Sequence, residues 1–241
     1  DQIVEARQRI RGGIFETPCT ESEMLSEMLG CRVHCKLEYL QRTGSFKERG
    51  ARNALLLLDE KQRATGVTAA SAGNHALALA YHGRQLGIPV TVVMPRFAPL
   101  VKQARCSALG ARVLVHGENI AEAKELADEL VLGEGLTYVH GFNDAAIIAG
   151  QGTIALEILE QVPGVDAVVV PIGGAGLVAG VGLAIKTARP RTKVIGVEPK
   201  RAASFTAALE AGRPVSTAML PTLADGLAVP RVGDRAFEIA R

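Results

Sequence analysis

Residues 43–51, Thr-Gly-Ser-Phe-Lys-Glu-Arg-Gly-Ala, place a lysine at the start of a predicted helix. The helical pattern runs from Lys47 to Leu58, and a positive charge is unfavourable at a helix N-terminus because the helix dipole is positive there. Lys47 is therefore either an exposed residue beside Glu48 or an amine whose charge is removed by chemistry, such as an imine with an aldehyde cofactor. Taken alone, this segment favours the exposed residue.

A second candidate loop, Ala-Ser-Ala-Gly-Asn-His-Ala at residues 70–76, follows the predicted strand Val67–Ala70 and starts a helix. Backbone N–H groups clustered at a helix start, together with Ser71 and Asn74 side chains, form an anion site that suits a carboxylate. The alternative is helix capping by Ser71 or Asn74, with His75 in the first turn. This segment alone leaves the two interpretations balanced.

A third loop, Ile-Gly-Gly-Ala-Gly-Leu at residues 172–177, follows the most apolar predicted strand and opens another helix. Small residues at 173–176 let backbone N–H groups come close to a phosphate. A tight turn that needs glycine is the alternative, and we favour the phosphate site.

The third loop also fits a dinucleotide-binding fingerprint, with Ala179 in the last position. Glu198 lies about 20 residues further on, where an acid that binds a ribose belongs. A nicotinamide-dependent enzyme is therefore an alternative. Such a unit would begin near Asp166 and would leave the first two loops unexplained.

Short β-branched segments alternate with Ala- and Leu-rich helical segments, and these elements must position the three loops. The predicted strands are residues 32–38, 67–70, 90–94, 112–115, 137–139, 167–171 and 194–198. The predicted helices include residues 76–86, 120–132, 146–162 and 177–188, with Gly87, Gly110 and Gly133 just beyond helical segments. This alternation predicts an α/β fold with parallel sheets and crossover helices.

Composition excludes several classes of function. The chain has 241 residues and a net charge of +2, so no bulk field attracts nucleic acid or a membrane surface. Aromatic residues make up 4% and Trp is absent, which argues against base stacking. No segment reaches the roughly 18 apolar residues of a membrane helix. The cysteines at 19, 31, 35 and 106 lack a second ligand pair for zinc, and they fit a reducing compartment.

Together and in this order, the three loops resemble those of the fold-type II pyridoxal-phosphate enzymes. That family includes threonine and serine dehydratases, serine racemase, threonine synthase and cysteine synthase. The resemblance extends from about Thr17 to the end of the chain. It includes Ala-Gly-Gln-Gly-Thr-Ile-Ala-Leu-Glu at residues 149–157, Val-Glu-Pro at 197–199 and Ala-Asp-Gly at 224–226.

The resemblance implies a role for each loop. It implies that Lys47 holds pyridoxal 5'-phosphate as a covalent imine and, when freed, removes the substrate's α-proton, which requires a lowered pKa. Phe46 would pack against the cofactor ring and Asn74 would bind its hydroxyl. The phosphate would be held by the backbone of Gly173, Gly174, Ala175, Gly176 and Leu177. The substrate carboxylate would be bound by Ser71, Gly73, Asn74 and His75.

The residue at position 72 separates branches of the family. Residues 71–75 resemble the dehydratase and racemase branch, in which racemases have a serine after the position of Ser71. Ala72 cannot move a proton, so we expect deamination of L-threonine, and of L-serine, to a 2-oxo acid and ammonia by α,β-elimination. An amino-acid racemase is the alternative. Racemase-type members bind a cation through residues matching Glu198 and Ser204, and serine is a poor ligand, so no metal is predicted.

The resemblance also implies two lobes, each a mostly parallel sheet flanked by helices, with the cofactor between them. The larger lobe would comprise residues 1–65 and 144–241, and the smaller inserted lobe residues 66–143. Family members continue beyond the position of Arg241 to a Ser or Cys that faces the pyridine nitrogen, so we expect this chain to be a fragment. We also expect a small amino-acid substrate, a homo-oligomer and a cytoplasmic location. A degenerate binding module is disfavoured by Lys47, Asn74 and the glycine loop.

Overall fold

The computed structural model describes residues 1–241 as an α/β chain with eight strands and eleven α-helices. The strands are β1 (Cys19–Glu21), β2 (His34–Lys36), β3 (Val67–Ala70), β4 (Val90–Met94), β5 (Arg112–Val115), β6 (Thr137–Tyr138), β7 (Ala167–Pro171) and β8 (Lys193–Val197). The helices are α1 (Gln2–Ile10), α2 (Glu23–Leu29), α3 (Lys47–Leu56), α4 (Glu60–Thr65), α5 (Asn74–Leu86), α6 (Leu100–Ala108), α7 (Ile120–Glu134), α8 (Ala145–Gln161), α9 (Gly176–Ala188), α10 (Ser204–Ala211) and α11 (Asp234–Ala240). Short 3-10 helices are η1 (Glu38–Leu40), η2 (Lys200–Ala202) and η3 (Asp225–Leu227).

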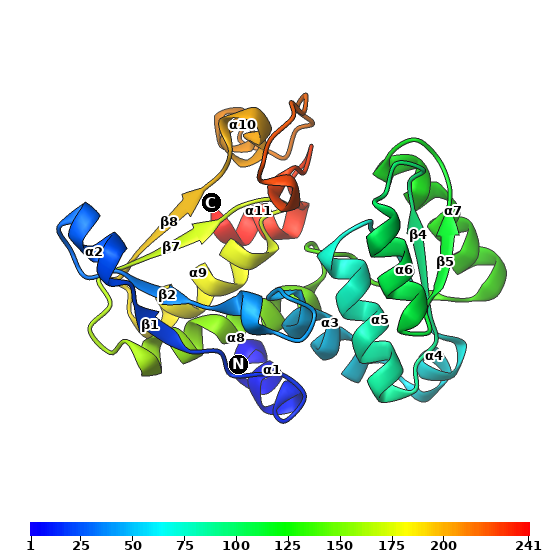
Figure 1. Ribbon diagram of the computed structural model, residues 1–241, viewed down its shortest axis with the longest axis horizontal. Coiled ribbons are helices and arrows are strands. Elements are labelled where there is room, and N and C mark those ends of the chain that lie inside the picture. The colour runs from blue at the N-terminus through cyan, green and yellow to red at the C-terminus, as the bar shows by residue number, and fades with distance from the viewer.

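Four strands form a parallel sheet in the order β5-β4-β3-β6. Val67 pairs with Val90 and also with Thr137, so β3 is a central strand with neighbours on both sides. All five residues of β4 are buried, as expected for a β-branched strand covered on both faces. Helices α5, α6 and α7 surround this sheet at one end of the molecule (Figure 1).

The second parallel unit pairs β7 with β8, and α9 makes the crossover between them. Val168 and Val170 of β7 are buried, whereas Ala167, Val169 and Pro171 are exposed, the alternation of a strand with one covered face. Strands β1 and β2 form a separate antiparallel pair. Helices α9 and α11 lie beside β7 and β8 at the other end of the molecule, with α3 and α8 between the two ends (Figure 1).

Two large hydrophobic clusters correspond to these ends. One unites residues of α1, α8, α9, α11 and β7, including Ile185 and Phe237. The other unites residues of α3, α5, β3 and β4, and it includes Ala51 and Ile147 from outside residues 66–143. The division into lobes of residues 1–65 with 144–241 and 66–143 stays a prediction.

The predicted parallel α/β class is confirmed, and the differences are local. Residues 32–38 contain a strand only at His34–Lys36, since the partner strand β1 has three residues and η1 begins at Glu38. Gly133 lies inside α7 rather than beyond it, and the helix ends at Gly135 with a φ of 72°. Gly87 does end α5 in the left-handed conformation, as its position predicts. None of the helices combines the length and apolar character that crossing a membrane requires.

Candidate functional site

Lys47 is the first residue of α3, and its amine points away from solvent. The side chain is half-buried, and Nζ donates a hydrogen bond of 2.6 Å to the carbonyl oxygen of Gly141. It has no carboxylate partner, and burial lowers the pKa of Lys47 to about 8. The interpretation of Lys47 as an exposed residue beside Glu48 is therefore wrong: Lys47 is half-buried and Glu48 is fully buried.

The loop of residues 71–75 leads into a helix that has no side-chain cap. Gly73 is the N-cap residue of α5, and the Ser71 hydroxyl accepts a 3.3 Å hydrogen bond from the Gly73 N–H. Asn74 is exposed. The N–H groups of Asn74 and His75 donate to no backbone acceptor. Capping of α5 by Ser71 or Asn74 is therefore not observed, and free donors remain at the helix start, where an anion is favoured.

The imidazole of His75 is buried behind this loop. Its Nε2 lies 2.9 Å from the carbonyl oxygen of Val139, and its Nδ1 has no partner. Burial, reinforced by the nearby Lys47 amine, lowers the pKa of His75 to about 3. His75 is therefore neutral, with the proton on Nε2. It donates a hydrogen bond to the segment 139–142, the same segment whose Gly141 carbonyl oxygen accepts from Lys47.

The third loop connects β7 to α9 and presents unpaired backbone donors. The N–H groups of Gly173, Gly174, Ala175, Gly176 and Leu177 donate to no backbone acceptor. Ala175 has a φ of 72°, the one non-glycine residue with positive φ in the chain. This conformation costs about 1–2 kcal/mol for a residue with a side chain. Consecutive N–H groups around such a residue form a concave anion site.

Packing against Phe142 is a second reason for glycine in this loop, and the residue types of the loop do not indicate it. A Cβ at Gly174 would overlap the ring of Phe142, and a Cβ at Gly176 would lie 2.6 Å from the Phe142 carbonyl oxygen. Gly173 instead faces Leu227 and Val229, each 3.3 Å from its ideal Cβ. Close packing of Phe142 therefore requires glycine at 174 and 176, whatever else the loop holds.

Residues 139–142 join the three loops, and sequence reasoning missed them. The Val139 carbonyl oxygen meets His75, the Gly141 carbonyl oxygen accepts from Lys47, and Phe142 packs on Gly174 and Gly176. The available signal was their position directly after β6, because ligands bind beyond the carboxyl ends of parallel strands. The loops of residues 43–47, 71–75 and 173–177 thus converge on one place.

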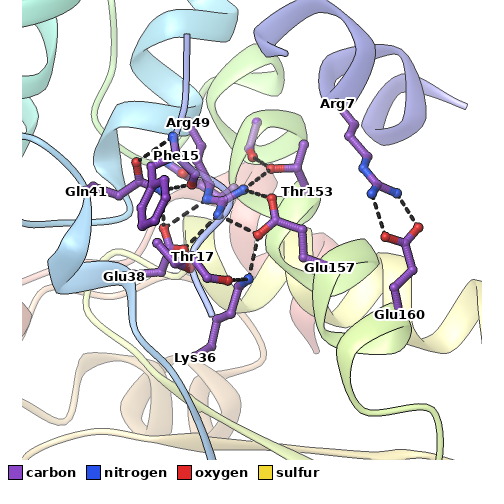
Figure 2. Close-up of polar contacts among 12 residues, drawn as sticks. Arg7, Phe15, Thr17, Lys36, Glu38, Gln41, Arg49, Thr153, Glu157 and Glu160 are labelled. Atoms are coloured by element: carbon purple, nitrogen blue, oxygen red, sulfur yellow. Dashed lines mark hydrogen bonds and ion pairs between the residues drawn. The ribbon is translucent and has the colours of Figure 1, made fainter. Parts of the chain in front are cut away.

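Arg49, two residues after Lys47, belongs to a buried polar cluster with a different character (Figure 2). Its guanidinium is 1% exposed and pairs with Glu38 at 2.7 Å and with Glu157 at 2.5 Å. Lys36 also pairs with Glu157, at 2.5 Å. Burial alone would lower the pKa of Arg49, but the hydrogen bonds and charges of the two carboxylates outweigh it and raise the pKa.

This cluster explains why residues 47–51 and 149–157 occur together. Glu157 is the last residue of the second motif, and Gly150 approaches the backbone of Gly50, with its ideal Cβ 2.6 Å from the Gly50 Cα. The second motif therefore holds α8 against α3 and orients the helix that begins with Lys47.

Glu198 binds backbone N–H groups of its own chain, which weakens the argument that it binds the ribose of a nicotinamide cofactor. Its carboxylate accepts hydrogen bonds from the N–H groups of Phe205, at 3.0 Å, and Thr206, at 2.8 Å. It therefore caps the start of α10. Ser204 beside it is buried.

The arrangement fits pyridoxal phosphate. The glycine-rich loop offers a concave set of unpaired N–H donors for a phosphate. The Lys47 amine, with no counter-charge and a pKa of about 8, suits reaction with an aldehyde.

Comparison with known proteins agrees with this fit. Residues 10–241 match the family described as pyridoxal-phosphate dependent enzyme. The chain is 46% identical to the L-threonine ammonia-lyase of Thermotoga maritima and 42% identical to the catabolic L-threonine dehydratase TdcB of Escherichia coli K12, each over all 241 residues. It superimposes on maize serine racemase with a TM-score of 0.96 at 36% identity, covering 100% of this chain and 73% of the racemase chain.

The chain belongs to the pyridoxal-phosphate dependent enzyme family. The predicted family, fold class and cofactor are thereby confirmed. The chain spans 60% of the length of the Thermotoga relative and 73% of the Escherichia relative.

Proposed function

We propose that this protein deaminates L-threonine, and L-serine, to a 2-oxo acid and ammonia by α,β-elimination. The observation that carries the proposal is the Lys47 amine, which is half-buried, has no carboxylate partner and lies at the junction of three loops. Relatives named L-threonine ammonia-lyase and L-threonine dehydratase, at 42–46% identity over the whole chain, support this substrate class.

In this proposal the cofactor lies where the three loops converge. Lys47 is its covalent attachment point and Phe46 packs against its ring. Asn74, whose side chain is exposed at the start of α5, binds the ring hydroxyl. The phosphate is held by the N–H groups of Gly173, Gly174, Ala175, Gly176 and Leu177. When bound, pyridoxal phosphate supplies an electron sink for the amino acid that loses its α-proton.

The chain's own residues then bind the substrate and move the proton. Donors around Ser71, Gly73, Asn74 and His75 hold the substrate carboxylate. Lys47, when free, takes the α-proton at Nζ, which requires a neutral amine. A pKa of about 8 brings the amine near the pH at which a general base works best. The Gly141 carbonyl oxygen, 2.6 Å from Nζ, is the acceptor that holds the free amine in place.

Ala72 favours elimination over racemisation. Lys47 is tethered on one side of the substrate, so return of a proton to the opposite side needs a second donor within about 2.6–3.2 Å. The methyl group of Ala72 packs against the second hydrophobic cluster and offers no proton. A racemase is the second candidate, supported by the match to maize serine racemase.

The test uses the full-length protein with L-threonine and L-serine. We expect 2-oxo acid and ammonia in equal amounts, with little D-amino acid detected by chiral chromatography of the remaining substrate. Ala72→Ser is expected to raise racemisation relative to elimination, whereas Ala72→Gly, which adds no hydroxyl, is not. Racemisation by the parent protein at the rate of elimination would move the assignment to the racemase.

The proposal includes a homo-oligomer in the cytoplasm. All four cysteines are free thiols, which suits a reducing compartment. Light scattering of the full-length protein coupled to size-exclusion chromatography gives the mass that tests the oligomer.

A further inference from the structure

A buried carboxylate–imidazole pair connects the helix of Lys47 to the helix of Asn74. Glu48 is the second residue of α3 and His82 lies about two turns into α5. Both side chains are 0% exposed, and Glu48 Oε2 lies 3.3 Å from His82 Nε2. Glu48 directly follows Lys47 and has no role in binding or catalysis in the function proposed above, and His82 lies outside the three loops.

The other oxygen of Glu48 holds the turn that precedes Lys47. Glu48 Oε1 accepts a hydrogen bond from the backbone N–H of Thr43, a buried residue. The turn from Thr43 to Phe46 is therefore tied at its first residue to the side chain that follows Lys47. Any displacement of the Glu48 carboxylate moves this turn and the start of α3.

The neighbours of each atom define the protonation of the Glu48–His82 pair. Arg52 Nη1 lies 3.5 Å from His82 Nδ1, so Nδ1 is the acceptor and the ring proton is on Nε2, which lies 3.3 Å from Glu48 Oε2. Neither Nε2 nor Oε2 has a partner with hydrogen-bond geometry, so each of these buried polar atoms has the other as its charged or polar neighbour. Burial lowers the pKa of His82 despite the adjacent carboxylate. Burial alone would raise the pKa of Glu48, but the adjacent His82 and the hydrogen bond from Thr43 lower it. An ionised carboxylate thus faces a neutral imidazole at 3.3 Å, and the contact between them is electrostatic.

The surroundings argue against a role in stability alone. Beside the polar side chains of Glu48, His82 and Arg52 lies the hydrophobic cluster shared by α3 and α5, which contains Ala51, Leu55 and Leu79, all 0% exposed. Replacing a buried polar pair by packed apolar side chains is often neutral or stabilising, because burial of the polar groups costs free energy. A contribution to stability alone therefore does not explain a polar pair at this interface.

We propose that Glu48 and His82 are positioning residues that set the Lys47 amine relative to the loop of residues 71–75. The proposal rests on the function proposed above. Glu48 fixes the turn before Lys47, and His82 fixes Glu48 to α5, whose N-terminus carries Asn74 and His75. The pair therefore sets the separation between the base and the groups proposed to hold the substrate carboxylate.

Matched substitutions at His82 test the pair in the full-length enzyme. His82→Leu removes the donor at similar volume, whereas His82→Gln retains a donor that can reach Glu48. Thr192→Val is the control, because it removes the hydrogen bond that the buried Thr192 hydroxyl donates to the Val165 carbonyl oxygen at 3.1 Å, outside the three loops.

Three measurements are made on each variant: kcat and KM with L-threonine, the visible absorbance of the bound cofactor, and the urea midpoint. For His82→Leu we expect kcat to fall at least tenfold while KM changes less than threefold, since a misplacement of about 1 Å can cost about 100-fold in rate. The wavelength or pH response of the absorbance band should shift as well. His82→Gln should recover most of kcat and restore the band, and Thr192→Val should keep both.

The outcomes separate this proposal from the proposed function. Parental kcat and an unshifted band in His82→Leu overturn the positioning role, as does an equal loss of kcat in Thr192→Val with an equal fall of the urea midpoint. If the parent converts neither L-threonine nor L-serine, the proposed function fails. The absorbance band of the three variants then still decides whether the pair positions Lys47.

Discussion

Two basic residues on the first turn of α3, Lys47 and Arg49, have opposite electrostatic surroundings. Arg49 lies between the carboxylates of Glu38 and Glu157, at 2.7 and 2.5 Å, and its pKa is raised. Lys47 has a carbonyl oxygen as its partner, at 2.6 Å, and its pKa falls to about 8. The same helix thus carries a fixed cation and an amine that readily becomes neutral.

The difference shows how burial serves structure or chemistry. A guanidinium surrounded by carboxylates stays charged and bonds several segments at once, so it locks α3 to α8 and to residues around Glu38 (Figure 2). An amine buried without a counter-charge loses part of its preference for a proton, so it becomes a nucleophile and a base. Two residues of separation are enough because successive helix positions face different surroundings.

The largest expected effect on activity comes from removing the Lys47 amine. Lys47→Ala should abolish release of 2-oxo acid and the visible band of bound cofactor, because a positioned base alone contributes about 10²–10⁴-fold. Lys124→Ala, at an exposed ion pair with Asp128, is the control and should keep both. The measurement is the absorbance spectrum after dialysis, together with a 2-oxo acid assay. A band that persists in Lys47→Ala would refute the assignment.

Removing the Arg49 guanidinium should lower the free energy of unfolding, rather than remove a group that takes part in the reaction. Arg49→Ala leaves Glu38 without a cationic partner and leaves Glu157 with Lys36 alone, and breaking a buried ion pair typically costs about 3–5 kcal/mol. Arg7→Ala is the control, because its pair with Glu160 is partly exposed and such pairs contribute about 0–1 kcal/mol. Urea unfolding monitored by circular dichroism gives both values. Equal losses in the two variants would show that the Arg49 cluster is no stronger than a surface pair.

Substitutions in the glycine loop test whether it holds an anion. Gly176→Asp should weaken cofactor binding at least tenfold, about 1.4 kcal/mol, through like-charge repulsion and a clash with Phe142. Gly176→Ala isolates the clash, and Gly182→Asp, in the same helix with only Val194 near its ideal Cβ, isolates the charge. Cofactor affinity is measured by absorbance titration. If Gly176→Asp and Gly176→Ala bind equally well, the charge argument for this loop fails.

The smallest expected effect is the pH response of Lys47. In the cofactor-free protein, acylation of Lys47 should rise with pH and level off above about 8, where the amine is neutral. The folded pKa lies below the ordinary value of 10.5, so the unfolded chain binds more protons between about 8 and 10.5. Stability from this group therefore increases as pH rises through that window. Mass spectrometry of the Lys47 peptide reports acylation, and a rate still rising at pH 10 would contradict the lowered pKa.

Much of the fold could be predicted because its signals are local. β-branched strands such as β4 and β7 and the helix-ending Gly87 depend on short segments, and the structure confirms them. The three loops were found because each lies where a loop meets the start of a predicted helix, the place where backbone N–H groups can bind an anion. Gly133 was misassigned because two glycines lie near the end of α7, and only packing decides which one ends the helix.

The parts that could not be predicted depend on contacts between distant segments. The Arg49–Glu157 pair joins residues 108 positions apart, and no periodicity indicates it. The carbonyl oxygens of Val139 and Gly141 leave no trace in the residue types, since every residue has one. Phe142 likewise became important only through its contact with Gly174 and Gly176.

Borohydride reduction of the full-length protein with bound pyridoxal phosphate tests the central claim most directly. The account predicts that peptide mapping by mass spectrometry finds the reduced cofactor on Lys47 and on none of the other lysines, with loss of the visible band. Attachment at another lysine, with Lys47 unmodified, would contradict the conclusion that burial without a counter-charge makes this amine the reactive one.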